Sequence, residues 1–294
     1  MIDFHKACQL RPQISYCAAL DAGSQEKLAL IRPWITPGPP GIILDIGSGT
    51  GKLTAALAQL YPMCEVLGID YSKSMTELAQ RRYCDSYLNL SFQWGTVNTL
   101  NLSTANTIIL SSVLHEVYSY SNDSLQAVSD MLEDSYNLLL PGGRIIIRDF
   151  IQPKFPEKAV ILHHRLDDIR NGHDFESFQK TFSRNISLGS IRKCNQWKIY
   201  ETNIGSAYEY IYRKDFHEMW EFELLERYGF WTLESAFNIL RSTGFSVIHS
   251  KRLQNSWLLN NSLTNRITLF DPLNQKQIRP PQSQILIAGE KAKQ

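Results

Sequence analysis

The feature that most constrains the fold is a glycine-rich loop between a short apolar run and a stretch with helical character. The apolar run spans residues 41–46, and the helical stretch spans residues 52–61. Continuous apolar runs are typical of strands that are covered on both faces, as in parallel sheets. Residues 47–51 alternate glycine with small residues, which permits a tight turn and a close approach to a ligand. The pattern predicts a strand, a turn and then a helix.

The same alternation of strands and helices continues along the chain. We expect further strands at residues 65–69, 91–95, 107–111 and 144–149. We expect the intervening helices at residues 73–83 and 124–140. Strands that alternate with helices predict a doubly wound α/β sheet. A helix at residues 232–242 and two later strands at residues 245–248 and 284–288 continue the pattern near the C-terminus.

These patterns divide the chain into four segments. We expect a helical N-terminal segment at residues 1–40 and the alternating core at residues 41–150. A helical and aromatic insert that covers the acceptor follows at residues 151–231, and residues 232–294 complete the sheet and carry a hairpin-like insert. The length of 294 residues permits one large domain or two small ones. Hydrophobic residues make up 43% of the chain, which excludes a disordered chain and is enough for a substantial core.

Both inserts break the strand–helix rhythm. In the first insert we expect helices at residues 159–169, 175–182 and 215–228, and in the second a hairpin arm at residues 266–270. In the N-terminal segment we expect one helix, at residues 24–31. Proline residues open the first insert at positions 153 and 156, which is typical of a chain that leaves regular structure.

Charge and cysteine content restrict the partners that we expect. Thirty basic residues balance 29 acidic ones, so a nucleic-acid partner is not expected. No apolar run approaches about 18 residues, and we expect no membrane partner. The five cysteines form no C-x-x-C motif and the N-terminus lacks a secretory pattern, so we expect free thiols and a cytoplasmic protein.

The glycine loop fails the better-known nucleotide-binding patterns. A Walker loop would need glycine in place of Ile46 and serine or threonine in place of Leu53. The dinucleotide pattern G-x-G-x-x-G fails because the third glycine stands at position 51 rather than 52. A nucleophile elbow is also excluded, because the glycines around Ser48 have the wrong spacing.

What remains is an acidic residue, then G-x-G-x-G, then an acidic residue that ends the second strand. Asp45 fills the first role and Asp70 the second, within the sequence D-Y-S-K-S-M at residues 70–75. A Pro-Gly-Gly turn at 141–143 precedes the fifth strand. This arrangement resembles the class I S-adenosylmethionine (SAM)-dependent methyltransferases of the small-molecule type. The resemblance covers about residues 41–150 and implies a doubly wound, seven-stranded, mostly parallel sheet with a helical lid before strand six.

The resemblance implies SAM as the cofactor and gives each motif a role. Asp45 and the glycine loop would face the methionine end of SAM, and Asp70 would hold the ribose hydroxyls. The positions implied to contact SAM are Asp45, Gly47, Ser48, Gly49, Thr50, Gly51, Asp70, Tyr71, Ser72, Met75, Gly95, Thr96, Val97 and Ser111. Tyr71 would lie against adenine. Thr96 stands where many relatives carry an acidic residue, so its hydroxyl or a backbone carbonyl would make the adenine amino contact.

Three residues are candidates for acid–base work on the acceptor. His115 and Glu116 follow the fourth strand, where the resemblance implies a border between cofactor and acceptor. Either could deprotonate or orient a weakly acidic acceptor, and either could instead close the loop structurally. His217, in the aromatic insert, is a third candidate base.

The insert also concentrates aromatic residues between positions 197 and 231. Tyr208, Tyr212 and Trp220 are predicted to line the acceptor pocket, since ring faces suit an apolar, planar or cationic acceptor. The alternative is that these rings, at helical spacing, form the core of a helix that packs on a sheet.

A metal site is not expected. His163, His164, Asp167 and Asp168 offer ligand atoms, but their spacing identifies no further ligand, and we interpret them as a solvated helix face. Ser111 and Ser112 occupy the strand-end positions where metal-dependent relatives carry acidic residues.

The predicted function is transfer of a methyl group from SAM to a small-molecule acceptor at oxygen, nitrogen or carbon, in a biosynthetic role. An RNA or protein methyltransferase is one alternative, although no N-P-P-[YF] motif for planar amino groups follows the fourth strand. A SAM-binding module without catalysis is another. A homodimer is compatible with the sequence.

Overall fold

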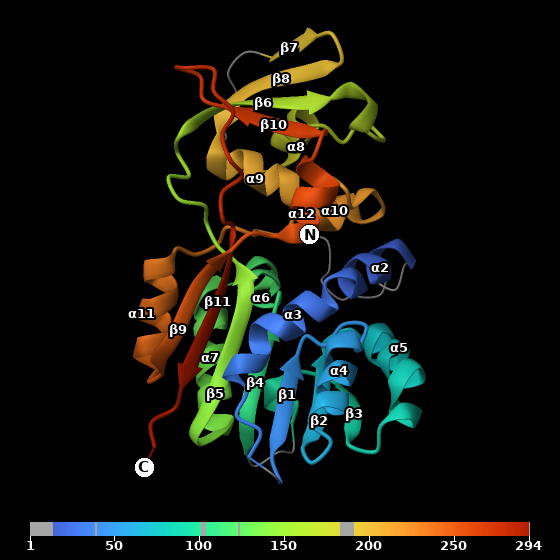
Figure 1. Ribbon diagram of the computed structural model, residues 1–294, viewed down its shortest axis with the longest axis vertical. Coiled ribbons are helices and arrows are strands. Elements are labelled where there is room, and N and C mark those ends of the chain that lie inside the picture. The colour runs from blue at the N-terminus through green and yellow to red at the C-terminus, as the bar shows by residue number, and fades with distance from the viewer. Residues whose placement is uncertain (1–13, 39, 101–103, 123, 183–190, 294) are drawn as a thin grey trace. The chain divides into compact units, whose positions relative to one another are not determined.

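The computed structural model describes residues 14–38, 40–100, 104–122, 124–182 and 191–293 (Figure 1). Two compact units divide the chain. The first takes its residues from 1–149, 233–251 and 285–294, and the second takes its residues from 150–232 and 252–284. Each unit is therefore assembled from stretches that are separated in the sequence.

The first unit is built on one seven-stranded sheet. Its strands are β1 (Ile42–Ile46), β2 (Glu65–Asp70), β3 (Leu90–Trp94), β4 (Ala105–Ser111), β5 (Leu139–Phe150), β9 (Ser246–Leu253) and β11 (Gln284–Glu290). The strand order is β3-β2-β1-β4-β5-β11-β9. The pairings of β1 with β2 and β4, of β2 with β3 and of β4 with β5 are all parallel. This topology confirms the predicted doubly wound, mostly parallel sheet.

The central strands are buried on both faces, as their continuous apolar runs predict. Ile43 and Leu44 on β1 are fully buried, and so are the three isoleucines of β5 at positions 145–147. Successive side chains on a strand point to opposite faces of the sheet, so burial of consecutive residues requires cover on both sides. The sheet therefore forms the middle layer of this unit.

The helices of this unit lie at the predicted places, except those at residues 14–22 and 114–120, where no separate helix was predicted. They are α2 (Ile14–Ala22), α3 (Ser24–Ile31), α4 (Lys52–Leu60), α5 (Lys73–Tyr83), α6 (Leu114–Tyr120), α7 (Ser124–Leu138) and α11 (Leu233–Thr243), with short turns η1 (Arg32–Trp34), η2 (Cys84–Ser86) and η3 (Val97–Thr99). Residues 1–13 of the predicted N-terminal helical segment lie outside the described residues. Across the described ranges, no helix has both the length and the apolar character needed to cross a membrane.

The second unit contains its own four-stranded sheet. The strands are β6 (Ala159–Arg165), β7 (Ile191–Cys194), β8 (Trp197–Asn203) and β10 (Ile267–Phe270), in the order β10-β6-β8-β7 and with antiparallel pairing throughout. Its helical elements are η4 (Leu166–Asp168), α8 (Phe175–Thr181), α9 (Ile204–Arg213), η5 (His217–Met219), α10 (Trp220–Glu223), α12 (Ser256–Leu258) and η6 (Leu259–Leu263). Val160 and Leu162 of β6 share a hydrophobic core with Tyr208 and Ile211 of α9.

The predicted helix at residues 159–169 is wrong. Residues 159–165 form β6, which pairs with β8 on one side and with β10 on the other. Local residue preferences are weak enough for such long-range pairing to override them. The predicted hairpin arm at residues 266–270 forms β10, which pairs with β6 and also makes an antiparallel bridge from Phe270 to Gln277. Residues 151–231 are therefore a mixture of strands and helices, not a helical insert.

The interpretation of His164 and Asp168 as part of a solvated helix face is wrong as well. The His164 side chain is only 1% exposed, and its Nε2 lies 3.0 Å from Asp168 Oδ2. The Lys214 ammonium donates to the same carboxylate oxygen across 2.8 Å. Because neighbouring strand residues face opposite ways, His163 lies on the other face of β6, where its ring packs near Phe270.

Candidate functional site

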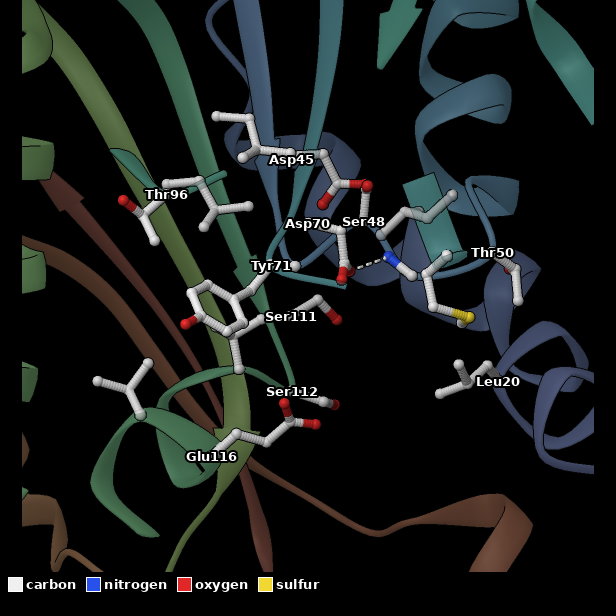
Figure 2. A pocket seen from close by; sticks show the side chains of 18 of the residues that line it. Leu20, Asp45, Ser48, Thr50, Asp70, Tyr71, Thr96, Ser111, Ser112 and Glu116 are labelled. Carbon is white, nitrogen blue, oxygen red and sulfur yellow. Dashed lines mark hydrogen bonds between the residues drawn. The ribbon is translucent and has the colours of Figure 1, made fainter. Parts of the chain in front are cut away.

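A cavity of about 390 Å³ opens at the carboxyl ends of β1, β2 and β4 within the first unit (Figure 2). Ligands of open α/β sheets bind at this edge, in the crevice outside the strand ends. Its wall combines the glycine loop, the residues that end the three strands, and one side of α3. The predicted cofactor residues that line it are Asp45, Gly47, Ser48, Gly49, Thr50, Asp70, Tyr71, Met75, Gly95, Thr96 and Ser111.

The glycine loop follows a path that only glycine tolerates well. Gly47, Gly49 and Gly51 have φ values of 73°, 52° and 80°, all in the left-handed region. A Cβ atom on Gly47 would lie 2.2 Å from a Val113 methyl group, and one on Gly51 would lie 2.7 Å from the Ala79 side chain. The first and third glycines therefore serve close packing, and the middle one faces the cavity.

Asp70 ties this loop to the end of β2. Its Oδ2 accepts a hydrogen bond from the backbone N–H of Gly49 across 2.7 Å, drawn as a dashed line in Figure 2. Its Oδ1 accepts from the N–H of Ser72 across 2.8 Å. Each carboxylate oxygen can accept more than one hydrogen bond, so capacity remains for two hydroxyl groups of a ligand.

Asp45 places a second carboxyl group in the cavity wall. Its side chain is 2% exposed and accepts a hydrogen bond from the Thr54 hydroxyl across 2.6 Å. Burial raises the pKa of Asp45 to about 6, and the hydrogen bond from Thr54 and the charge of Lys27 oppose that rise. A buried carboxylate of this kind favours a cationic ligand group beside it. The α-ammonium group of SAM has that chemistry.

Two hydroxyl groups on the same wall have no hydrogen-bond partner in the described part of the protein. The Oγ atoms of Ser48 and Ser111 are buried and make no hydrogen bond. Buried polar atoms are seldom left unpaired, so these two hydroxyls point to a polar ligand. Together with the two aspartates, they fit the polar groups of SAM.

The adenine end of the predicted site is only partly assembled at the cavity. Tyr71, Gly95 and Thr96 line the wall, and Tyr71 is 36% exposed. Val97 is buried and does not line the cavity. Ser72 has a different task, since its hydroxyl accepts from the Met75 N–H and caps α5.

His115 and Glu116 both lie in the first turn of α6, but only one of them lines the cavity. Glu116 lines the cavity, whereas His115 is not among the lining residues. The His115 Nδ1 lies 2.8 Å from Asp149 Oδ1, and both side chains are buried. The second oxygen of Asp149 accepts from the N–H groups of Val113 and Leu114. Asp149 therefore holds both His115 and the first turn of α6 in place.

The predicted acceptor residues of the aromatic insert belong to the second unit. Tyr208, Tyr212 and Trp220 are buried in its hydrophobic core, which agrees with the core alternative. The Tyr212 hydroxyl donates to the Ser283 carbonyl across 3.2 Å. The His217 Nδ1 lies 3.3 Å from the Nδ1 of His173. A contact of these residues with an acceptor stays a prediction.

Sequence reasoning missed part of the cavity wall. The residues missed are Leu20, Ser24, Lys27, Leu53, Ile69, Val117, Tyr120, Ser121 and Met131. Ser24 and Lys27 are three residues apart on α3, which places them on one side of that helix, and Leu20 comes from α2. That spacing was available in the sequence, but nothing in it says which side of a helix faces a ligand.

Comparison with known proteins agrees with this geometry. A family model described as a methyltransferase domain matches residues 40–209, more than half of the chain. A ubiquinone/menaquinone biosynthesis C-methyltransferase of Desulfotalea psychrophila is 28% identical over 118 residues, which are 40% of this chain and 45% of that protein. A malonyl-[acyl-carrier protein] O-methyltransferase of Bacillus anthracis is 24% identical over 143 residues, 49% of this chain and 50% of that protein. The chain thus spans about half the length of these curated relatives.

Solved structures share the fold over most of the chain. A SAM-dependent methyltransferase of Mesorhizobium loti has a TM-score of 0.52 at 15% identity, with 92% of this chain and 99% of that chain covered. One of Thermotoga maritima has a TM-score of 0.51 at 14% identity, with 98% and 99% covered. The chain therefore belongs to the methyltransferase domain family and has the class I fold.

Proposed function

We propose that the protein transfers the methyl group of SAM to a small-molecule acceptor at oxygen, nitrogen or carbon. One observation carries the proposal: the cavity wall extends beyond the residues assigned to the cofactor. Val117 and Tyr120 of α6 and Met131 of α7 line it, together with Val113. Small-molecule pockets are typically mostly apolar and supplied with a few polar groups, as this wall is.

In this proposal the cofactor lies against the strand ends. Asp45 and the glycine loop bind the amino-acid end of SAM, Asp70 accepts from the ribose hydroxyls, and Tyr71 lies against adenine. Bound SAM supplies a methyl group that its sulfonium charge has already activated. The remaining task of the protein is to hold an acceptor atom in line with that methyl group, because orientation alone supplies several kcal/mol of rate enhancement.

Glu116 is the acceptor-side residue with the best support. Its carboxylate belongs to the cavity wall, while the neighbouring His115 is bound by Asp149. A carboxylate in that position can accept a proton from a weakly acidic acceptor or orient its donor group. We assign this role to Glu116 and give His115 the role of fixing the start of α6.

The relatives suggest which acceptors to try first. One is named for ubiquinone and menaquinone biosynthesis and the other for a malonyl group on a carrier protein. A planar ring and a short acid differ in their needs, and the apolar wall made by Val117, Tyr120 and Met131 favours the planar ring.

The test is transfer of label from radioactive SAM into a fractionated extract of the host. The wild type should label material that survives nuclease and protease treatment and is extracted as a small molecule, and Asp70→Ala should not. Label in RNA or in protein would replace the proposal with the corresponding alternative. SAM binding without any transfer, in the extract and with demethylated quinone precursors, would favour a non-catalytic module.

A further inference from the structure

The cavity wall holds three carboxyl groups and one basic side chain. The carboxyl groups belong to Asp45, Asp70 and Glu116, and the basic side chain is that of Lys27 on α3. Among the described residues that line the cavity, no other lysine, arginine or histidine occurs. Any carboxylate that binds in this cavity therefore has one side-chain cation to pair with.

Lys27 has charged neighbours but no direct partner. Within the described part of the chain, its ammonium group makes no hydrogen bond or ion pair. Burial and the nearby charge of Arg148 together lower the pKa of Lys27 to about 8, while Asp45, Asp21 and Asp149 oppose the shift. Lys27 is partly buried, so its ammonium group loses part of its hydration, and a bound anion would offset that cost.

The backbone offers little else to an anion at this place. N–H groups of a glycine loop often bind anionic ligand groups. Here the N–H groups of Gly47 and Ser48 donate to the Ile69 carbonyl, and that of Gly51 donates to the Ser48 carbonyl. The N–H of Gly49 donates to Asp70. Most of the loop is thus already committed inside the protein.

SAM carries an ammonium and a carboxylate on the same carbon atom. Asp45 has the charge to face the ammonium, and Asp45 and Lys27 line the same cavity. We propose that Lys27 binds the α-carboxylate of SAM while Asp45 faces the α-ammonium. The inference rests on the cofactor site of the proposed function. It adds a residue from outside the matched family domain, which begins at residue 40.

The experiment compares two ligands that differ only in the carboxylate. Binding of SAM and of decarboxylated SAM is measured by calorimetry for the wild type, Lys27→Met, Lys27→Arg and the control Lys251→Met, which alters an exposed lysine on β9. The wild type should prefer SAM by about tenfold or more, the range of a hydrogen bond between charged groups. Lys27→Met should remove that preference, Lys27→Arg should keep part of it, and Lys251→Met should keep all of it.

Each other outcome has a distinct meaning. An equal loss for both ligands in Lys27→Met would overturn the proposal, because the lysine would then act on the shape of the site. Unchanged SAM binding by Lys27→Met would also overturn the proposal. Lys27 would then be available to pair with an acidic methyl acceptor instead. Methylthioadenosine, which lacks the whole amino-acid tail, serves as the folding control and should bind all four proteins alike. If it does not bind the wild type either, the cofactor site itself is misassigned.

Discussion

The carboxylate of Asp70 accepts a hydrogen bond from the backbone N–H of Gly49, across 2.7 Å, so the end of β2 fixes the turn that leaves β1. The same carboxylate accepts from the N–H of Ser72 at the start of α5. One side chain therefore organises two neighbouring connections of the sheet. Its proposed role toward ribose depends on that organisation, because the loop and the carboxylate must face the same ligand.

Asp70→Ala is expected to weaken SAM binding by about tenfold to a hundredfold, since hydrogen bonds from hydroxyl groups to a charged acceptor are lost. Calorimetry measures the change. Asp70→Asn keeps one acceptor oxygen and should lie between Asp70→Ala and the wild type. Unchanged affinity in Asp70→Ala would refute the ribose assignment.

Gly47 and Gly49 should respond differently to substitution. Gly47→Ala places a Cβ atom 2.2 Å from Val113 and should destabilise the protein by about 2 kcal/mol or more. Gly49→Val meets Leu20 at 3.5 Å, so it should carry the backbone cost of its φ of 52° without a close clash and should lose SAM binding by filling the cavity. Urea denaturation and calorimetry separate the two effects. Gly172 has a φ of 71° and no atom within 4 Å of an added Cβ. Gly172→Ala therefore measures only the loss of stability that a side chain causes at a left-handed φ.

Asp45→Asn should stabilise the protein without ligand. The folded pKa of Asp45 is about 6 against an ordinary value of 3.8, so the folded state binds more protons between these values. The free energy of unfolding of the wild type therefore falls as the pH rises from about 4 to about 6. Above about pH 6 it stays at this lower value as far as Asp45 is concerned. We expect a gain of about 1–3 kcal/mol for Asp45→Asn in urea at pH 7 and none at pH 3.5. Weaker SAM binding should accompany the gain.

Glu116→Gln and His115→Ala should separate turnover from cofactor binding. The proposed role of Glu116 toward the acceptor predicts about a hundredfold loss of turnover, in the range of general acid–base catalysis, with SAM affinity retained. His115→Ala should lower both stability and turnover, because Asp149 loses the imidazole as a partner in the first turn of α6 and keeps the two backbone N–H groups there. His217→Ala is measured beside them. Wild-type turnover in all three variants would remove these side chains from the mechanism.

Asp168→Asn should destabilise the second unit. Burial alone would raise the pKa of Asp168, but hydrogen bonds from His164 and Lys214 outweigh it and bring the value to about 2. The folded pKa is depressed, so this stabilisation is present above pH 3.8 and is lost as the pH falls toward 2. A loss of about 2–3 kcal/mol in the free energy of unfolding is expected at pH 7 and a smaller one at pH 3. The control Asp167→Asn alters an exposed neighbour and should have little effect.

The first unit could be predicted because its signals are local. Residues 41–51 carry their strand, turn and helix start within a single stretch, and the identity of each glycine follows from its left-handed φ. Asp70 could be predicted because the second strand of such a sheet ends beside the loop. The inward side of α3 could not be predicted, since Lys27 reaches the cavity through a packing arrangement that leaves no trace in local sequence.

The second unit resisted prediction because its pairings are distant in sequence. Ile161 faces Glu201 of β8 on one side and Phe270 of β10 on the other. Both partner strands lie far from β6 in the sequence. Local residue patterns alone therefore predict a helix at residues 159–169. The aromatic residues of α9 were recognised, but their burial against β6 could not be foreseen without that strand.

The position of β11 between β5 and β9 has a consequence for synthesis on the ribosome. Hydrogen bonding along one edge of β5 must wait until residues 284–290 have left the exit tunnel, although β5 itself emerges over a hundred residues earlier. Until then β5 presents a bare apolar edge of the kind that chaperones bind. A chain shortened before residue 284 would keep the whole cofactor loop and still expose that edge, so aggregation should precede any loss of the loop itself.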